Sequence, residues 1–148
     1  FESYVAAVLQ KNLDSRQYRV YVQAKGKYLF ELPQKQFALR PDLVIEDLNS
    51  GEKTVLDTKW KLLSPQWHNY GISQADMYQM YAYQKEYAAK QTVLLYPDCE
   101  AIADQKIPFC YSSSSGSLVR VQTLHLDSPI AMVEAVRELL DIASQPSK

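Results

Sequence analysis

The sequence lacks any long hydrophobic stretch. No apolar run reaches the roughly 18 residues that a membrane-spanning helix needs, so no membrane segment is expected. The start also lacks the basic, apolar and small-residue order of a signal peptide. The chain opens at Phe1 and enters a helical pattern at once. We therefore expect a fragment of a longer protein, consisting of a single domain over residues 1–148.

Cysteine, histidine and excess charge are also scarce. Cys99 and Cys110 form no CxxC pair, which favours two free thiols in a reducing cytoplasm. His68 and His125 lack the spacing of a zinc site or a catalytic triad and are expected to be structural. The formal net charge of −1 argues against a nucleic-acid coat protein, which should be basic. It does not exclude an enzyme whose metal-binding carboxylates offset its phosphate-binding lysines.

The hydrophobic pattern alternates between helical and strand periods, which predicts an α/β fold with helices packed on a mixed sheet. Ser73, with Asp76 three residues later, predicts the start of a long helix. A turn at Lys25–Lys27 is expected to join two strands as a hairpin. Helices are expected over 2–13, 73–89 and 128–143, and strands over 18–23, 28–32, 53–60, 92–96, 106–111 and 118–126, with 37–46 largely extended.

The strand ending at Trp60 carries two charged residues among apolar ones. Side chains alternate faces along a strand, so Asp57 and Lys59 point one way while Leu56, Thr58 and Trp60 point the other. Burial of a carboxylate costs several kcal/mol unless it is paired or bound to a metal. The alternation therefore predicts a functional carboxylate at Asp57.

A hairpin would bring a second carboxylate close to Asp57. If Asn49-Ser50 are the two central residues of a tight turn, Glu46 faces Lys53 and Asp42 faces Asp57. Directly opposed residues have Cβ atoms about 5 Å apart, and two carboxylates so close repel each other unless a cation lies between them. The alternative from spacing alone is a pair of structural ion pairs, from Lys59 to each aspartate.

A divalent cation between these aspartates would define a catalytic site. Asp42 and Asp57 would hold Mg²⁺ together with the backbone carbonyl of Thr58. The ion would polarise a phosphate oxygen and lower the pKa of a bound water. Lys59 would position that water and stabilise the negative charge that develops on the phosphate.

Several segments together resemble a known family. Pro41-Asp42 followed by Asp57-x-Lys59 matches the PD-(D/E)xK nuclease pattern. The wider strings 39–45, 55–61 and 72–83, with the opening residues 1–5, resemble the McrC family, the nuclease subunits of the McrBC modification-dependent restriction systems. The resemblance covers most of residues 1–87 and fades toward the C-terminus, where only the order of elements matches.

This resemblance implies a restriction-endonuclease-like fold, an α/β domain with a mixed sheet flanked by helices. It implies a Mg²⁺-dependent endonuclease, with Mn²⁺ as a substitute, that hydrolyses double-stranded DNA to 5′-phosphate and 3′-hydroxyl ends. It also implies a cytoplasmic bacterial or archaeal protein with a GTP-driven McrB-like AAA+ partner. That partner would recognise methylated cytosine and contact a region that precedes Phe1.

The resemblance also assigns secondary residues. Glu2 would complete the metal shell, although an exposed Glu also simply favours a helix start. Gln74 and Tyr78, four apart on one helix, match a QxxxY element that braces the catalytic lysine or binds phosphate and base. Arg40 and Lys61 would contact the DNA backbone. Two alternatives stay open: a catalytically silent DNA-binding or assembly module of the same fold, and a repair-type nuclease of the same superfamily.

Overall fold

The computed structural model describes residues 1–100 and 109–144. Its main body is a six-stranded mixed sheet with the strand order β1-β4-β5-β6-β8-β7. The strands β5, β6 and β8 are parallel neighbours, whereas β1, β4 and β7 pair antiparallel. The predicted mixed α/β architecture is confirmed. The bounds are α1 Glu2–Asn12, β1 Tyr18–Val22, β2 Lys27–Phe30, β3 Gln36–Leu39, β4 Leu43–Asp47, β5 Lys53–Thr58, η1 His68–Gly71, α2 Gln74–Glu86, β6 Gln91–Pro97, β7 Phe109–Ser112, β8 Leu118–Leu124 and α3 Pro129–Ser144.

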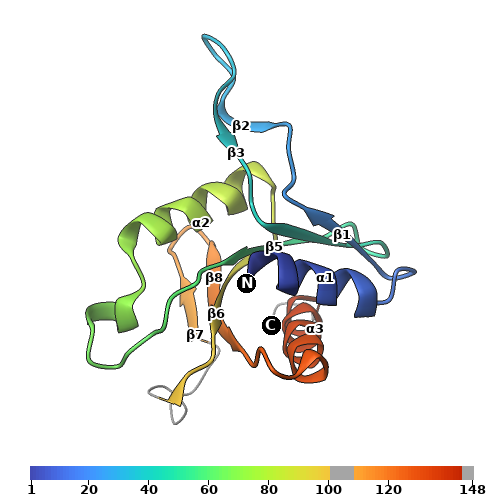
Figure 1. Cartoon of the computed structure of the whole chain (residues 1–148). Coiled ribbons are helices and arrows are strands. Elements are labelled where there is room, and N and C mark those ends of the chain that lie inside the picture. Colours follow the sequence, from blue (N-terminus) through green and yellow to red (C-terminus); the bar gives the residue numbers. More distant parts are fainter. Residues whose placement is uncertain (101–108, 145–148) are drawn as a thin grey trace.

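Two hydrophobic cores lie on opposite faces of the sheet. One joins α1 and α3 to the sheet residues Leu43, Leu56 and Leu95. The other joins α2 to Val55, Leu94 and their neighbours. Figure 1 shows the same layers, with α1 and α3 on one side of the sheet and α2 on the other. Every residue of β6 is buried, as its apolar sequence predicts for a central strand.

The helix α2 begins as the sequence predicts. The Ser73 side chain accepts a hydrogen bond from the Asp76 backbone N–H at 3.0 Å, which satisfies one of the free donors at the helix start. The predicted strand over 106–111 is confirmed only in part, since residues 106–108 lie outside the described residues. In the part of the chain that the structure describes, no helix is long and apolar enough to cross a membrane.

One expectation about the strands is wrong. The turn at Lys25–Lys27 does not close a hairpin, because β1 pairs with β4 in the main sheet while β2 pairs with β3 in a separate two-stranded sheet. This second sheet, which we call the arm (residues 24–40), projects from the main body (Figure 1). The extended stretch expected over 37–46 is consequently divided between β3 and β4.

Candidate active site

The β4–β5 hairpin positions the two aspartates of the candidate site. Its register pairs Glu46 with Lys53 and ends at Leu43 opposite Leu56, as predicted. Asp42 and Asp57 occupy the next position on each strand, at the end of the hairpin away from its loop. The backbone N–H of Gln23, which follows β1, donates to the Asp42 carbonyl at 2.8 Å and fixes this strand end.

The predicted two-residue turn of this hairpin is wrong. The Asp47 N–H donates to the Glu52 carbonyl at 2.9 Å, which leaves four loop residues between them. The observed loop is two residues longer than predicted but is centred on the same two residues. The register of β4 and β5 is therefore unchanged, and Asp42 still lies opposite Asp57. Gly51 adopts a positive φ of 76° in this loop, a conformation that glycine adopts without strain.

Leu56 and Asp57 lie on opposite faces of β5 as the alternation predicts, but the strand ends at Thr58, whose hydroxyl bonds to Asp42. Leu56 packs into the core beneath α1 and α3, and the Trp60 ring lies 5.4 Å from the Phe1 ring. Asp57 faces the other side, where its carboxylate meets Lys59, the residue that follows the end of β5. Charged side chains therefore collect on the α2 face of the sheet.

Asp42 is held by the backbone and hydroxyl of one residue. Its Oδ2 accepts hydrogen bonds from the Thr58 backbone N–H at 2.8 Å and from Thr58 Oγ1 at 2.6 Å. Both bonds use one carboxylate oxygen and tie the end of β4 to the end of β5. The Asp42 side chain is thereby fixed beside Asp57.

Asp57 is a carboxylate in a dry environment. It is only 4% exposed. Burial raises its pKa above the ordinary value, and the nearby Asp42 charge raises it further, while Lys59 opposes the shift. A buried carboxylate beside a second carboxylate requires positive charge nearby.

Lys59 supplies part of that charge and is itself held by three side chains. Its Nζ lies 2.7 Å from Asp57 and 3.4 Å from Asp76, and donates a hydrogen bond to Gln79 Oε1 at 3.1 Å. Burial alone would lower the pKa of Lys59, but its bonds to Asp57 and the charge of Asp76 raise it. The Lys59 side chain therefore carries its positive charge at neutral pH. Asp57 and Asp76 contact this one ammonium and Asp42 lies beside Asp57, so the cluster has more carboxylates than ammonium groups.

The helix α2 carries two QxxxY pairs, and the structure brings the second one to Lys59. Gln79 bridges Lys59 and the buried hydroxyl of Tyr83, to which its amide donates at 3.0 Å. The expected pair, Gln74 and Tyr78, share a face and bond to each other at 2.5 Å, but both side chains are exposed. Five residues along a helix turn the side chain by about 140°, which places the first pair away from the site.

This geometry corrects the interpretation of Gln74 as the residue that braces Lys59. Gln79 makes that contact, and Asp76 makes a second one. The sequence predicts only a helix-capping role for Asp76. The signal that could have found them is the helical spacing of Asp76, Gln79 and Tyr83, which share one face. A role of Gln74 and Tyr78 in binding phosphate or base stays a prediction.

The remaining predicted site residues surround this cluster. Glu2 accepts a hydrogen bond from the Gln23 amide at 2.7 Å, and Gln23 is in turn bonded to the Asp42 backbone. Glu2 is thus linked to Asp42 through a neighbour. Lys61 donates to the Gly71 carbonyl. Arg40 is exposed next to Pro41, and DNA contacts of Arg40 and Lys61 stay predictions.

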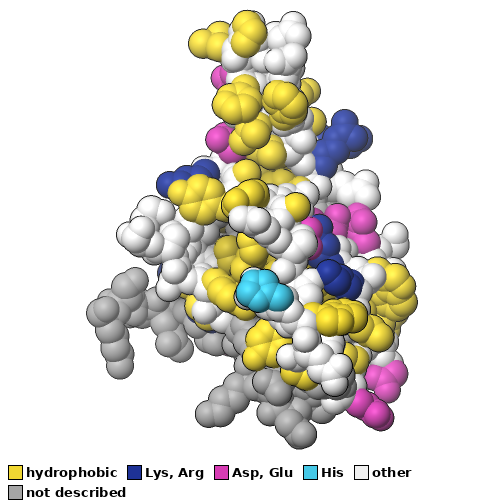
Figure 2. All heavy atoms as spheres, turned by 90° about the vertical axis from the view of Figure 1, so that its left-hand side faces the viewer, with side chains coloured by type: hydrophobic (Ala, Val, Ile, Leu, Met, Phe, Trp, Pro, Cys, Tyr) yellow, Lys and Arg dark blue, Asp and Glu magenta, His cyan; other side chains and the backbone are white. Residues whose placement is uncertain are grey.

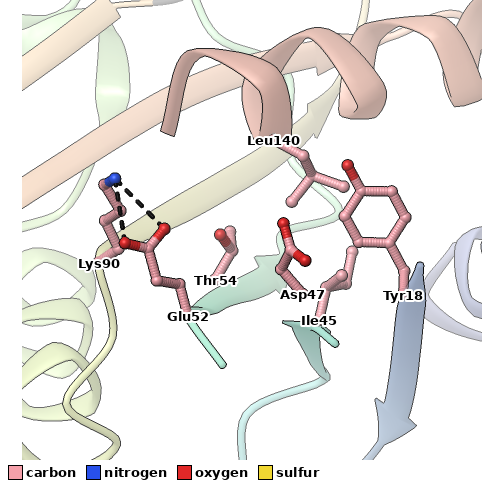
Figure 3. A pocket seen from close by; sticks show the side chains of 7 residues that line it. All are labelled: Tyr18, Ile45, Asp47, Glu52, Thr54, Lys90 and Leu140. Carbon is pink, nitrogen blue, oxygen red and sulfur yellow. Dashed lines mark hydrogen bonds and ion pairs between the residues drawn. The ribbon is translucent and has the colours of Figure 1, made fainter. Parts of the chain in front are cut away.

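A second crevice, at the loop end of the same hairpin, also gathers charged groups. Figure 3 shows Lys90 pointing toward Glu52, with Asp47 beside Tyr18 across the crevice. Lys90 Nζ lies 3.2 Å from the Glu52 carboxylate. The cavity volume of about 10 Å³ leaves room for no more than about one water, so this crevice is unsuited to a ligand.

The donor set at Asp42 and Asp57 suits a hard divalent cation. Two carboxylates at neighbouring strand ends present oxygen ligands, and Oδ1 of Asp42 is not used by the bonds to Thr58. Within residues 1–100 and 109–144, no three His, Cys, Asp or Glu side chains form a metal-binding group. A cation here would be held by Asp42 and Asp57 together with backbone or substrate oxygens, and a role of Glu2 in its shell stays a prediction. His125 lies apart from this site, 2.9 Å from Asp98.

The mixed sheet and its flanking helices place this chain in the class of restriction-endonuclease-like α/β domains, as predicted. A family model described as McrBC 5-methylcytosine restriction system component matches residues 1–97. The chain belongs to this family, which confirms the resemblance seen in the sequence.

One solved structure extends the comparison beyond residue 97. A chain in the refined half-complex from a tetradecameric assembly of Thermococcus gammatolerans McrB AAA+ hexamers with bound McrC has a TM-score of 0.67 and 19% sequence identity to this chain. The match covers 96% of this chain and 32% of that one, so the present chain spans about a third of its length. No curated protein matches. The similarity establishes that the fold continues through β8, β7 and α3.

Proposed function

We propose that this domain is the metal-dependent endonuclease domain of a McrBC restriction system and hydrolyses phosphodiester bonds in double-stranded DNA. The observation that carries the proposal is the pairing of Asp42 and Asp57 at adjacent strand ends, with Lys59 held beside them by Asp57. Membership of the McrBC family supports the substrate class. The partner would be a McrB-like AAA+ protein, because the similar solved chain belongs to an assembly with McrB hexamers.

The roles of the side chains follow from their contacts. Asp42 and Asp57 would hold Mg²⁺, with the Thr58 carbonyl as a further ligand and Mn²⁺ as a substitute. When bound, the ion supplies polarisation of the phosphate and a more acidic water. Lys59 is kept cationic and fixed by three side chains, so it would act as a positioned charge for the phosphate and orient the attacking water. Gln79 would act as a positioning residue for Lys59.

One observation also favours a second candidate, a catalytically silent module of the same fold. The 2.7 Å contact between Lys59 and Asp57 and the bonds from Thr58 to Asp42 are what structural ion pairs and hydrogen bonds would give. In that case the cluster would only join β4, β5 and α2. The excess of carboxylates over ammonium groups in the cluster favours the nuclease instead, since it leaves a cation to be bound.

The test is cleavage of methylated duplex DNA by the full-length protein assembled with its AAA+ partner in Mg²⁺. We expect Asp57→Asn to lower the cleavage rate by more than about 100-fold, since even residues that only support metal ligands cost 10- to 100-fold. The matched control is Glu52→Gln at the other end of the hairpin, which should cut at the parental rate. Parental cleavage by Asp57→Asn, with unchanged circular dichroism, would leave the silent module as the better account.

A further inference from the structure

The arm is unusual because it places large apolar side chains in solvent. Leu32 is 85% exposed, Phe37 68% and Phe30 55%. The Phe30 and Phe37 rings contact each other edge to face at 6.1 Å, so they form one surface across β2 and β3. Figure 2 shows hydrophobic side chains gathered on the arm at the top of the molecule. Exposed apolar groups collected in this way mark an interaction surface.

The charge of the arm is opposite to that of the rest of the chain. Residues 24–40 contain four basic side chains, Lys25, Lys27, Lys35 and Arg40, and a single acidic one, Glu31. The complete chain has a net charge of −1, so the residues outside the arm are net acidic. A basic projection is complementary to a polyanion such as duplex DNA, and it repels the equally basic arm of a second copy.

Both ends of the arm are anchored at the candidate active site. Before the arm, Gln23 donates its backbone N–H to the Asp42 carbonyl at 2.8 Å. After the arm, β3 ends at Leu39, three residues before Asp42. At its base, Lys27 Nζ lies 5.5 Å from the centre of the Tyr87 ring on the α2 side. The base of the arm therefore lies next to Asp42, within reach of a duplex whose scissile phosphate would be held at Asp42 and Asp57.

We propose that the arm is a DNA-binding element, an inference that rests on the proposed nuclease function. Lys25, Lys35 and Arg40 hold the phosphate backbone, and the exposed side chains of Leu32 and Phe37 make apolar contact in a groove of the duplex. The partner is thus duplex DNA beside the cleavage site. The arm adds binding area that the small cluster around Lys59 cannot supply.

The test is fluorescence anisotropy of labelled duplex DNA with the full-length protein alone, in chelator, over a range of salt concentrations. In Lys25→Gln/Lys35→Gln, the slope of log affinity against log salt should become shallower by about two, because two phosphate contacts are removed. In Leu32→Ser/Phe37→Asn, affinity should fall about fivefold or more at every salt concentration, with the slope unchanged. Asn is used at position 37 because that residue has a φ of 60°, which Asn tolerates.

The matched control is Lys11→Gln/Arg16→Gln, which removes the same charge from the exposed end of α1 and the turn after it. This control should keep the parental slope to within about half a unit. Parental binding by both arm variants, or no duplex binding by the parental protein, would overturn the proposal. So would arm variants that alter only the mass of the protein in light scattering, because the arm would then be a protein interface.

The variant Asp57→Asn distinguishes DNA binding by the arm from DNA cleavage at the candidate site. Asp57→Asn should bind duplex like the parental protein and lose only cleavage. If it loses cleavage while the arm variants bind normally, the nuclease proposal stands and the arm inference fails. If it cleaves at the parental rate while the arm variants lose affinity, the domain binds DNA through the arm but Asp57 is not part of a nuclease site.

Discussion

Carboxylates at both ends of the β4–β5 hairpin contact a lysine, and the two ends differ in burial. At the strand end, the Asp57 and Lys59 side chains are 6% and 23% exposed. At the loop end, the Glu52 and Lys90 side chains are 42% and 32% exposed. A carboxylate–lysine pair is thus buried at the strand end of the hairpin and solvent-exposed at its loop end.

This difference determines which end needs a functional explanation. An exposed ion pair stabilises a fold by less than about 1 kcal/mol and costs little to keep. A buried pair costs desolvation, and at Asp57 the second carboxylate of Asp42 adds repulsion. The excess carboxylate at the strand end is therefore buried, where solvent cannot balance its charge.

The largest expected contrast between the two ends is in metal binding. Titration of Mn²⁺ into the full-length protein in a calorimeter should give a binding isotherm that disappears in Asp42→Asn/Asp57→Asn, since both carboxylate ligands are removed. The control Asp47→Asn/Glu52→Gln removes the same charge from the loop end and should bind normally. Equal binding by the strand-end variant would exclude Asp42 and Asp57 as the ligands.

The second contrast is in stability. Lys59→Met leaves the buried Asp57 carboxylate beside Asp42 without its cation, and should lower the free energy of unfolding by about 2 kcal/mol. Lys90→Met removes an exposed partner and should cost less than about 1 kcal/mol. Urea unfolding followed by circular dichroism measures both. Equal losses would mean that the Lys59 cluster is no more tightly coupled than a surface ion pair.

The pairing of Asp42 with Asp57 could be predicted from sequence because it depends only on side-chain alternation and on the centre of the hairpin loop. Alternation fixes which residues share a face, and the sum of opposed positions fixes that Asp42 meets Asp57. Lengthening the loop by one residue on each side keeps the same residues opposed, so the wrong turn length did not change the predicted pairing. The pairing partner of β2 could not be predicted in the same way, because the turn at Lys25–Lys27 looks like a hairpin turn whether or not the strands pair.

The residues of α2 that contact Lys59 could not be predicted from periodicity alone. Gln74–Tyr78 and Gln79–Tyr83 have the same spacing, and only the packing of Tyr83 and Met80 against the sheet decides which pair faces Lys59. The hydrophobic pattern of this helix is blurred by its tyrosines, which occur on both faces. The sequence therefore predicted the type of contact and the helix that makes it, but assigned it to the wrong pair.

The third contrast compares these two pairs. Gln79→Ala removes the acceptor that positions Lys59 and should lower cleavage by about 10-fold, as is usual for residues that orient a catalytic group. Gln74→Ala, on the exposed face, should change cleavage less than twofold if its partner Tyr78 has no role in DNA binding. The rate under saturating DNA reports positioning of Lys59, and the affinity for DNA reports a binding role. Loss of affinity in Gln74→Ala would support the predicted role of Gln74 and Tyr78 in binding phosphate or base.

The smallest contrast concerns two buried tyrosines, one near each end of the hairpin. Tyr96 is completely buried, and among the described residues its hydroxyl has no hydrogen-bond partner. Tyr18, which lines the crevice at the loop end, accepts a hydrogen bond from Gln17 at 3.1 Å. Tyr96→Phe should therefore raise the free energy of unfolding by up to about 1 kcal/mol, whereas Tyr18→Phe should lower it by about 0.5 to 1 kcal/mol.

Alkaline pH makes the Tyr96 prediction sharper. Burial raises the pKa of Tyr96 above 10.0, and the charges of Asp76 and Asp57 raise it further. Above about pH 10 the unfolded chain releases this proton while the folded chain keeps it, so the stability from Tyr96 is present below pH 10 and is lost as pH rises. Tyr96→Phe should make the decline in stability above pH 10 less steep. An unchanged decline would mean that the Tyr96 hydroxyl ionises as readily in the folded chain as in water.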